Sequence, residues 1–189
     1  MAHAESLPND VLEAVAEQIG AILPGVADSA DLRDAQVTMG ETFELWALGA
    51  DAITQPINDL NQLATQTGRW HHQVAYRGEI GSFARSAPLG AEPSSWRVAE
   101  FFESPLAKKI DEAINWIDQN TDMDPLVRLL VVPAYQLHAF WLLDAENVQV
   151  FVIDCPSQFT YLRSGYLFSQ DEFLQSLRQE HHIIGRYRS

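Results

Sequence analysis

The chain has 189 residues, of which 47% are hydrophobic, and a formal net charge of −14 at pH 7. The apolar content excludes wholesale disorder, and the length fits one domain. The negative charge disfavours direct binding to a nucleic-acid backbone or an anionic membrane. No apolar run approaches the roughly 20 residues that a membrane-spanning helix needs.

The acidic residues are concentrated in the first third of the chain. Residues 1–60 contain eleven Asp and Glu and one base, Arg33, for a net charge of −10, whereas residues 61–189 carry a net charge of −4. This asymmetry favours a partner protein with a basic surface. The alternative is that these acids keep a helical face in water.

Residues 1–68 are predicted to form an acidic, helical segment that packs on a sheet. The first helix is expected over 6–20, where apolar residues share one face at helical spacing. That face consists of Val11, Leu12, Val15, Ile19 and Ile22. A second helix is expected from Asp28 or Ser29 to about Met39. A third is expected from Thr54 to Gly68, since glycine commonly ends a helix.

The pattern changes at Arg69, where a sheet domain over 69–189 is expected. Short alternating runs at 70–76 and 80–86 predict a hairpin turning at Arg77-Gly78, and 96–102 predicts a third strand. Ser104-Pro105 then provides a helix cap and a proline at the first helical position. The helix stripe is Leu106, Ile110, Ala113, Ile114 and Ile117.

The most apolar stretch, 126–156, predicts the core of the sheet. A strand over 126–132 ends at Pro133, and strands over 135–143 and 148–154 flank a polar turn. The favoured register places Leu143 opposite Val148 and His138 opposite Ile153. Both faces of this hairpin are then largely apolar, which indicates central strands that are covered on each side.

The C-terminal region predicts a last helix. Ser169 followed by Glu172 is a capping box, and the helix is expected to reach about Glu180. The fold class is therefore α+β: a mainly antiparallel sheet of about five or six strands, a helical N-terminal third, one mid-chain amphipathic helix and a C-terminal helix, together forming one compact domain.

Cys155 and His138 are the candidate catalytic residues, since a thiolate beside an imidazole is a common nucleophile. The alternative is a small hydrophobic side chain, because Cys155 follows a strand and has no glycine-rich turn or helix start to lower its pKa. As the only cysteine, Cys155 excludes an internal disulfide, which agrees with a cytoplasmic location.

The histidine doublets at 71–72 and 181–182 do not form ready-made metal sites. Adjacent residues point to opposite faces of a strand, and they diverge by about 100° on a helix. Only folding could assemble His72 and His138 with a carboxylate such as Asp154 or Glu79. No metal or cofactor is therefore predicted.

Five arginines lie near the predicted strands and could bind a carboxylate or phosphate group if they converged. They are Arg69, Arg77, Arg85, Arg97 and Arg128. The alternative is that they pair with the acidic helices of the same chain. The glycine-rich phosphate loops and the nucleophile-elbow pattern do not occur in the sequence. Trp116, at the edge of its helix stripe, either covers a core margin or anchors a partner.

Two functions follow from these features. The first is a non-enzymatic interaction module, an adaptor, chaperone or inhibitor, that uses the acidic helices or an exposed sheet edge. The second is a small-molecule enzyme or ligand-binding protein with a pocket between the sheet and the N-terminal helices. Its candidate pocket residues are His72, Arg85, His138 and Cys155.

Overall fold

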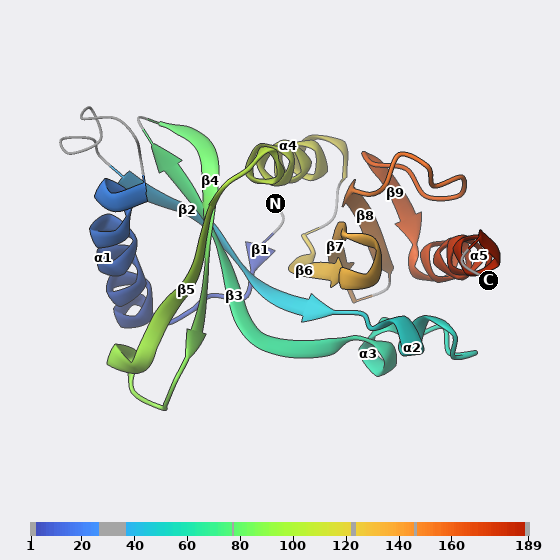
Figure 1. The fold of residues 1–189 in the computed structure, drawn as a ribbon, viewed down its shortest axis with the longest axis horizontal. Coiled ribbons are helices and arrows are strands. Elements are labelled where there is room, and N and C mark those ends of the chain that lie inside the picture. Colours follow the sequence, from blue (N-terminus) through green and yellow to red (C-terminus); the bar gives the residue numbers. More distant parts are fainter. Residues whose placement is uncertain (1–2, 27–36, 77, 122–123, 146, 188–189) are drawn as a thin grey trace. The chain divides into compact units, whose positions relative to one another are not determined.

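The computed structural model describes residues 3–26, 37–76, 78–121, 124–145 and 147–187 (Figure 1). The elements in this part of the chain, in order, are β1 (His3–Ala4), α1 (Asn9–Val26), β2 (Val37–Ala47), α2 (Ala50–Ile53), α3 (Leu60–Leu63), β3 (Thr65–Tyr76), β4 (Glu79–Pro88), the 3-10 turn η2 (Pro93–Ser95), β5 (Trp96–Glu103), α4 (Pro105–Asn120), β6 (Leu126–Val132), the 3-10 turn η3 (Pro133–Tyr135), β7 (Leu137–Leu143), β8 (Val148–Asp154), β9 (Tyr166–Ser169) and α5 (Gln170–Tyr187). None of the helices described is long and apolar enough to cross a membrane.

The fold is α+β, and its strands form one mixed sheet. In the described residues the sheet has nine strands in the order β5-β4-β3-β2-β6-β7-β8-β9, with β1 beside β6. β2 runs parallel to β6, with Leu45 opposite Leu129 and Ala47 opposite Val131. The prediction of five or six strands was therefore wrong, and β2–β6 is a parallel pair in a sheet that was predicted to be mainly antiparallel.

The prediction of a helical N-terminal third was also wrong, because the long strand β2 occupies Val37–Ala47. Both faces of this strand are covered: Phe43 and Leu45 are buried, and so is Glu44 between them. The run Thr42-Phe43-Glu44-Leu45 alternates polar and apolar residues, as a strand does, but the prediction of a helical first third passed over it. The predicted helix over 28–39 lies mostly outside the described residues, but Met39 is in β2.

The segment from Thr54 to Gly68 also differs from the predicted helix. Only Leu60–Leu63 forms a helical turn, which Asp59 caps by accepting a hydrogen bond of 2.9 Å from the Asn61 amide. Strand β3 then begins at Thr65. Gly68 has a positive φ of 69° inside this strand, a conformation open to glycine, and does not end a helix.

Local predictions from the middle and end of the chain were confirmed. The amide of Leu106 donates to Ser104 Oγ at the start of α4. Ser169 and Glu172 form the reciprocal capping box of α5. In the β7–β8 hairpin the predicted register holds from Ala139 to Leu143. β4, β5 and the antiparallel β3–β4 hairpin were also predicted correctly.

The chain forms two compact units, each made of separated segments. Unit 1 comprises the described residues within 1–3, 45–67 and 113–189, and unit 2 those within 4–44 and 68–112. Strands β2 and β3 and helix α4 contribute to both units. The predicted core hairpin and the C-terminal helix belong to unit 1.

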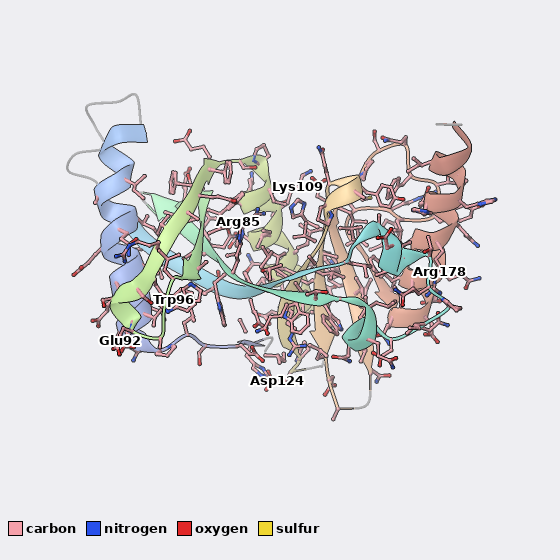
Figure 2. All side chains as sticks on the ribbon, turned by 60° about the horizontal axis from the view of Figure 1, so that its bottom comes forward. Arg85, Glu92, Trp96, Lys109, Asp124 and Arg178 are labelled. Carbon is pink, nitrogen blue, oxygen red and sulfur yellow. The ribbon has the colours of Figure 1, made fainter. Side chains whose placement is uncertain are left out.

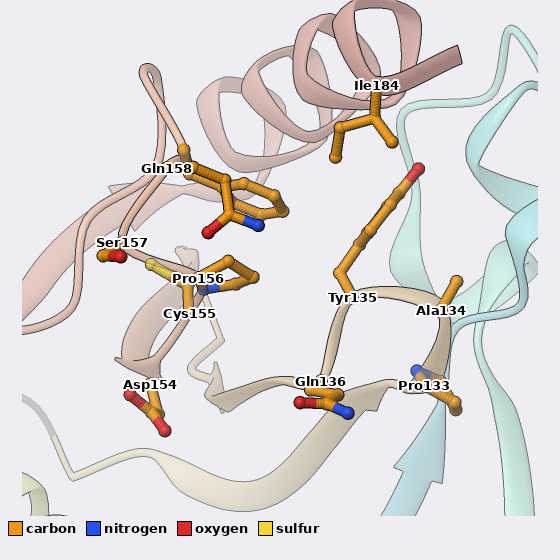
Figure 3. A pocket seen from close by; sticks show the side chains of 11 residues that line it. Pro133, Ala134, Tyr135, Gln136, Asp154, Cys155, Pro156, Ser157, Gln158 and Ile184 are labelled. Carbon is orange, nitrogen blue, oxygen red and sulfur yellow. The ribbon is translucent and has the colours of Figure 1, made fainter. Parts of the chain in front are cut away.

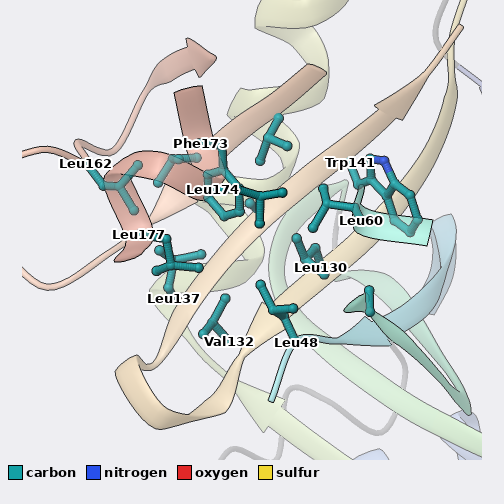
Figure 4. Close-up of a cluster of buried hydrophobic side chains, with 14 of the residues drawn as sticks. Leu48, Leu60, Leu130, Val132, Leu137, Trp141, Leu162, Phe173, Leu174 and Leu177 are labelled. Carbon is teal, nitrogen blue, oxygen red and sulfur yellow. The ribbon is translucent and has the colours of Figure 1, made fainter. Parts of the chain in front are cut away.

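The core of unit 1 packs α5 against strands β6, β7 and β8 (Figure 4). Trp141 and Phe173 are fully buried in it. Two polar side chains of α5 also bind the α2–α3 segment. Gln170 accepts from the Leu60 amide and donates to the Asn58 carbonyl, both at 3.0 Å. Arg178 donates to the carbonyls of residues 53 and 57. This irregular segment is therefore held by hydrogen bonds as well as by burial.

The core of unit 2 contains the apolar stripe of α1, with Val11, Val15 and Ile19 buried together with Val74 of β3 and Ala84 of β4. Helix α1 therefore follows the predicted pattern, although it extends beyond the predicted range of 6–20. The acidic residues of the helix lie on its other side and are exposed.

Side chains protect both ends of the sheet. At one end, Gln18 of α1 donates to the Trp96 carbonyl at 2.9 Å and accepts from the Val98 amide at 3.1 Å. Trp96 lies at the start of β5, on the side of α1 (Figure 2). At the other end, the Ser169 amide of β9 donates to Glu172. Since unpaired edge groups invite pairing with another chain, these contacts oppose aggregation.

Replacing Gln18 with Ala is expected to lower the free energy of unfolding by about 1–3 kcal/mol, because it leaves the part-buried Val98 amide of β5 without its acceptor and removes one of two donors to the Trp96 carbonyl. Urea denaturation measures this loss. The matched control is Gln119→Ala on the exposed side of α4, which should change stability by less than about 0.5 kcal/mol. Equal effects of the two substitutions would contradict the role of Gln18 at this edge.

Candidate functional site

A hollow of about 570 Å³ opens in unit 1 beside the end of strand β8 (Figure 3). Its lining residues come from the corner after β6, from the loop after β8 and from α5: Pro133, Ala134, Tyr135, Gln136, Asp154, Cys155, Pro156, Ser157, Gln158, Phe159 and Ile184. We call it the Cys155 hollow. Its volume is within the range of roughly 300–1,000 Å³ typical of small-molecule sites.

The corner that forms one side of the hollow contains a strained residue. Pro133 ends β6 and begins the turn η3, and Gln136 follows with φ 53° and ψ 32°, in the left-handed region. Among the described residues it is the one non-glycine with positive φ. Such a conformation costs about 1–2 kcal/mol and is found more often at functional sites. Its amide donates to the Pro133 carbonyl at 3.2 Å, which tightens the corner.

The opposite side of the hollow is a loop that Glu180 of α5 holds in place. The buried Glu180 carboxylate accepts hydrogen bonds from the amides of Thr160 and Tyr161, both at 2.5 Å, and from that of Leu162 at 3.4 Å. Ser164 Oγ accepts from the Cys155 amide at 3.1 Å. Side-chain oxygens therefore accept hydrogen bonds from the loop at its start, Cys155, and in its middle, residues 160–162.

The environment of Cys155 disfavours its thiolate form. Burial is the main cause that raises the pKa of the thiol, and the nearby carboxylates of Asp154 and Glu180 raise it further, although hydrogen bonding with Ser164 opposes them. The thiol donates to the Leu162 carbonyl over 3.7 Å. Because the thiolate is the reactive form, Cys155 is not an activated nucleophile.

His138 is not placed as the sequence predicted. A register shift between His138 and Ala139 puts His138 opposite Asp154, whereas the uniform ladder predicted Ile153. The predicted pairing of a Cys155 thiolate with the His138 imidazole depended on that ladder, in which the two residues lie on the same face of the sheet. A different histidine, His181, lies at the hollow: its Nδ1 is 2.5 Å from the hydroxyl of the lining residue Tyr135.

His72 belongs to unit 2 and is completely buried there. Its Nε2 is 2.7 Å from Ser86 Oγ and its Nδ1 is 3.1 Å from Thr42 Oγ1. Burial lowers the pKa of His72 from 6.5 to about 4, so the imidazole is neutral at pH 7. The pair with Ser86 has the spacing of a serine nucleophile and its base, but Ser86 is 0% exposed and no substrate can reach it.

His71 is buried on the opposite face of β3. Its ring stacks on Phe83 at 4.6 Å, and its Nε2 donates to Gln73 Oε1 at 3.4 Å. Gln73 in turn donates to the Ala107 carbonyl of α4. The doublet thus points to two faces, as the sequence predicted. Across the residues that the structure describes, no group of three or more His, Cys, Asp or Glu could hold a metal ion.

The arginines do not converge on an anion pocket. Arg69 and Arg85 both pair with Glu100 of β5, at 2.9 and 3.2 Å. Arg97 donates to carbonyls of its own loop. Arg128 lies over the Trp46 ring at 4.4 Å. Both ion pairs are formed with a carboxylate of a strand, whereas the sequence analysis gave pairing with the acidic helices as the alternative. Arg77 lies outside the described residues.

Trp116 is half-buried in unit 1, with its ring 4.9 Å from that of Phe151. This contact matches a tryptophan that covers a core margin. The other predicted pocket residues are divided between the units: His72 and Arg85 are in unit 2, and His138 and Cys155 are in unit 1. Of these, only Cys155 lines the Cys155 hollow.

Sequence reasoning missed Gln136, Tyr135, Glu180, Thr42 and Ser86. Nothing in the sequence marks a glutamine for positive φ or a helical glutamate for burial. Ser86 is near His72 because a register shift after Val74 places His72 opposite Ala84, which makes Ser86 its diagonal neighbour. Tyr76 pairs with Glu79, as the predicted hairpin requires, and the sequence did not indicate the shift that follows.

No protein-family model, curated protein or solved structure matches this chain. The chemistry of its own side chains therefore carries the functional argument.

The buried His72 makes stability depend on pH. Unfolded His72 takes up a proton below about pH 6.5, whereas folded His72 does so only near pH 4. The unfolded state therefore binds more protons than the folded state between these pH values. As the pH drops from 6.5 to 4, the contribution of His72 to the free energy of unfolding falls by up to about 3 kcal/mol. Urea denaturation across this range should show a flatter profile in His72→Gln. The exposed His182→Gln should keep the wild-type profile; a wild-type slope in His72→Gln would contradict the assignment.

The Cys155 thiol should alkylate slowly. We expect the midpoint of its iodoacetamide pH–rate profile to be higher than that of an exposed cysteine peptide, because burial and two carboxylates disfavour the thiolate. Asp154→Asn should lower the midpoint by removing a negative charge, and Ser164→Ala should raise it by removing a hydrogen bond to the thiolate. A midpoint at or below that of the peptide would contradict this environment.

Proposed function

We propose that the protein is a non-enzymatic interaction module that binds a partner protein with a basic surface through the acidic face of α1. This face consists of Asp10, Glu13 and Glu17, all exposed. Spacings of three and four residues place the three carboxylates within about 60° around the helix axis. The exposure of these carboxylates, opposite the buried Val11, Val15 and Ile19, is the observation that supports the proposal.

The acidic face suits long-range recognition of a basic surface. Glu13 and Glu17 are four residues apart, so their like charges destabilise the free helix by a few tenths of a kcal/mol. A nearby cationic surface removes this repulsion. Charges of this kind mainly accelerate association and exclude partners of the wrong sign. The binding should therefore weaken as salt is added.

The protected ends of the sheet favour the helix over an edge strand as the contact. Gln18 occupies backbone groups of β5, and the same strand has an extra residue, Ala99, between the pairs Ser86–Val98 and Arg85–Glu100. A bulge and a side-chain bridge both hinder the addition of a strand. The raised pKa of the Cys155 thiol and the burial of Ser86 support a non-enzymatic role.

A cytoplasmic location belongs to the same proposal. Cys155 is the only cysteine and is a free, half-buried thiol. This state suits a reducing compartment.

Binding of a small molecule is the second candidate function, and the Cys155 hollow is the observation that favours it. Its volume fits a small ligand, and its walls combine aromatic rings with polar side chains.

Reversing the acidic face should weaken partner binding. The protein is purified gently from its own cells and its complex is identified by native mass spectrometry. Affinity for that partner is then measured for wild type and for Glu13→Lys with Glu17→Lys. We expect a loss of about ten-fold at low salt and a weaker salt dependence, because attractive charges become repulsive.

The matched control is Glu79→Lys with Glu103→Lys, which makes the same change in net charge at exposed positions of unit 2. It should retain nearly the wild-type affinity. Equal losses in both variants, or isolation of the wild type without a protein partner, would contradict the proposal. Deleting residues 1–60 is not a usable test, since it removes the central strand β2.

A further inference from the structure

The charged side chain that lines the Cys155 hollow is a carboxylate. Asp154 is the one Asp or Glu among its eleven lining residues, and none of the eleven is Lys or Arg. Asp154 directly precedes Cys155 in the chain, and its charge contributes to raising the pKa of the Cys155 thiol. A ligand with a negative charge would therefore be repelled, whereas a cation would be attracted.

The hollow also has an apolar side. The rings of Tyr135 and Phe159 meet edge to face, with their centroids 5.5 Å apart. Tyr135 points toward Ile184 of α5 in Figure 3, with Gln158 and Pro156 across from it. Aromatic rings and aliphatic side chains suit the methylene stem of a charged group, and the faces of aromatic rings attract cations.

Hydrogen bonds within the chain hold several groups around the hollow. The Tyr135 hydroxyl is held by His181, the strained Gln136 closes the corner, and Glu180 pins the opposite loop. A site that is already ordered loses less entropy on binding, which favours affinity for even a small ligand.

We propose that the Cys155 hollow binds a guanidinium or ammonium group carried on an aliphatic stem. The charged group points toward Asp154, and the stem lies along Tyr135 and Phe159. The cation is either a free alkyl amine or the side chain of an Arg or Lys in a partner protein. This inference goes beyond the role of α1 and does not depend on it, since the two sites belong to different units.

The first test uses n-butylguanidinium at millimolar concentration, far below denaturing levels, as the probe. Backbone amide NMR should show saturable shifts at Gln136, Cys155 and Ser157. The probe should also slow alkylation of Cys155 by covering it. Pentanoate and n-butanol have comparable stems without a positive charge and should bind at least ten-fold more weakly. Equal binding of pentanoate, or no saturable shifts with the guanidinium probe, would overturn the proposal.

Variants then test whether probe binding depends on the Asp154 carboxylate and on the space inside the hollow. Asp154→Asn should weaken n-butylguanidinium binding about ten-fold, as expected for loss of a charge-assisted contact. Asp144→Asn makes the same charge change in the turn at the other end of the β7–β8 hairpin and should bind as wild type. Ser157→Trp changes an exposed residue and should abolish binding by filling the hollow. Wild-type affinity in Asp154→Asn or in Ser157→Trp would overturn the assignment.

The source of the cation is distinguished with two further probes. N-acetyl-arginine N-methylamide represents a side chain in a protein, and agmatine represents a free amine. Binding of the capped arginine as strong as that of n-butylguanidinium supports a protein ligand. Binding of agmatine at least ten-fold tighter than that of the capped arginine supports a free amine. These results are independent of the Glu13 and Glu17 variants, so this inference and the α1 proposal can fail separately.

Discussion

Burial of both faces of strands β7 and β8 is the constraint on which unit 1 depends. Phe140, Trp141 and Val152 are fully buried, so neither face of the hairpin can remain in water. One face of this region receives Phe173 and Leu177 of α5. Helix α5 is therefore a structural necessity, because without cover the hairpin would expose a large apolar area.

Two polar side chains of α5 hold the irregular backbone around the Cys155 hollow and the α2–α3 segment. The buried carboxylate of Glu180 satisfies three amides of the loop after β8, and Arg178 satisfies carbonyls of the α2–α3 segment. Both sets of contacts hold irregular backbone that has no ladder of its own. The Cys155 hollow exists because this loop is held near the strained corner at Gln136, so its shape depends on the docking of α5.

The two most reactive arrangements in the chain are suppressed by burial. Burial keeps His72 neutral and Ser86 out of reach, and it keeps the Cys155 thiol protonated. The same burial that stabilises each unit therefore disfavours nucleophilic chemistry at these two sites. The exposed carboxylates of α1 and the hollow beside Asp154 remain accessible, and the two proposals above rest on them.

The amino-acid sequence by itself determined the features that depend on near neighbours. These are the Ser104 cap and stripe of α4, the capping box at Ser169, the β7–β8 turn and the pairing from Ala139 to Leu143. Tertiary structure decided the rest: β2 lies in the sheet between β3 and β6, and β6 comes from a part of the chain about 80 residues away. The conformation of Gln136, the partners of His72 and the pKa of Cys155 likewise depend on residues far away in the chain. Local patterns do not encode them, because burial and diagonal neighbours arise only when the strands have paired.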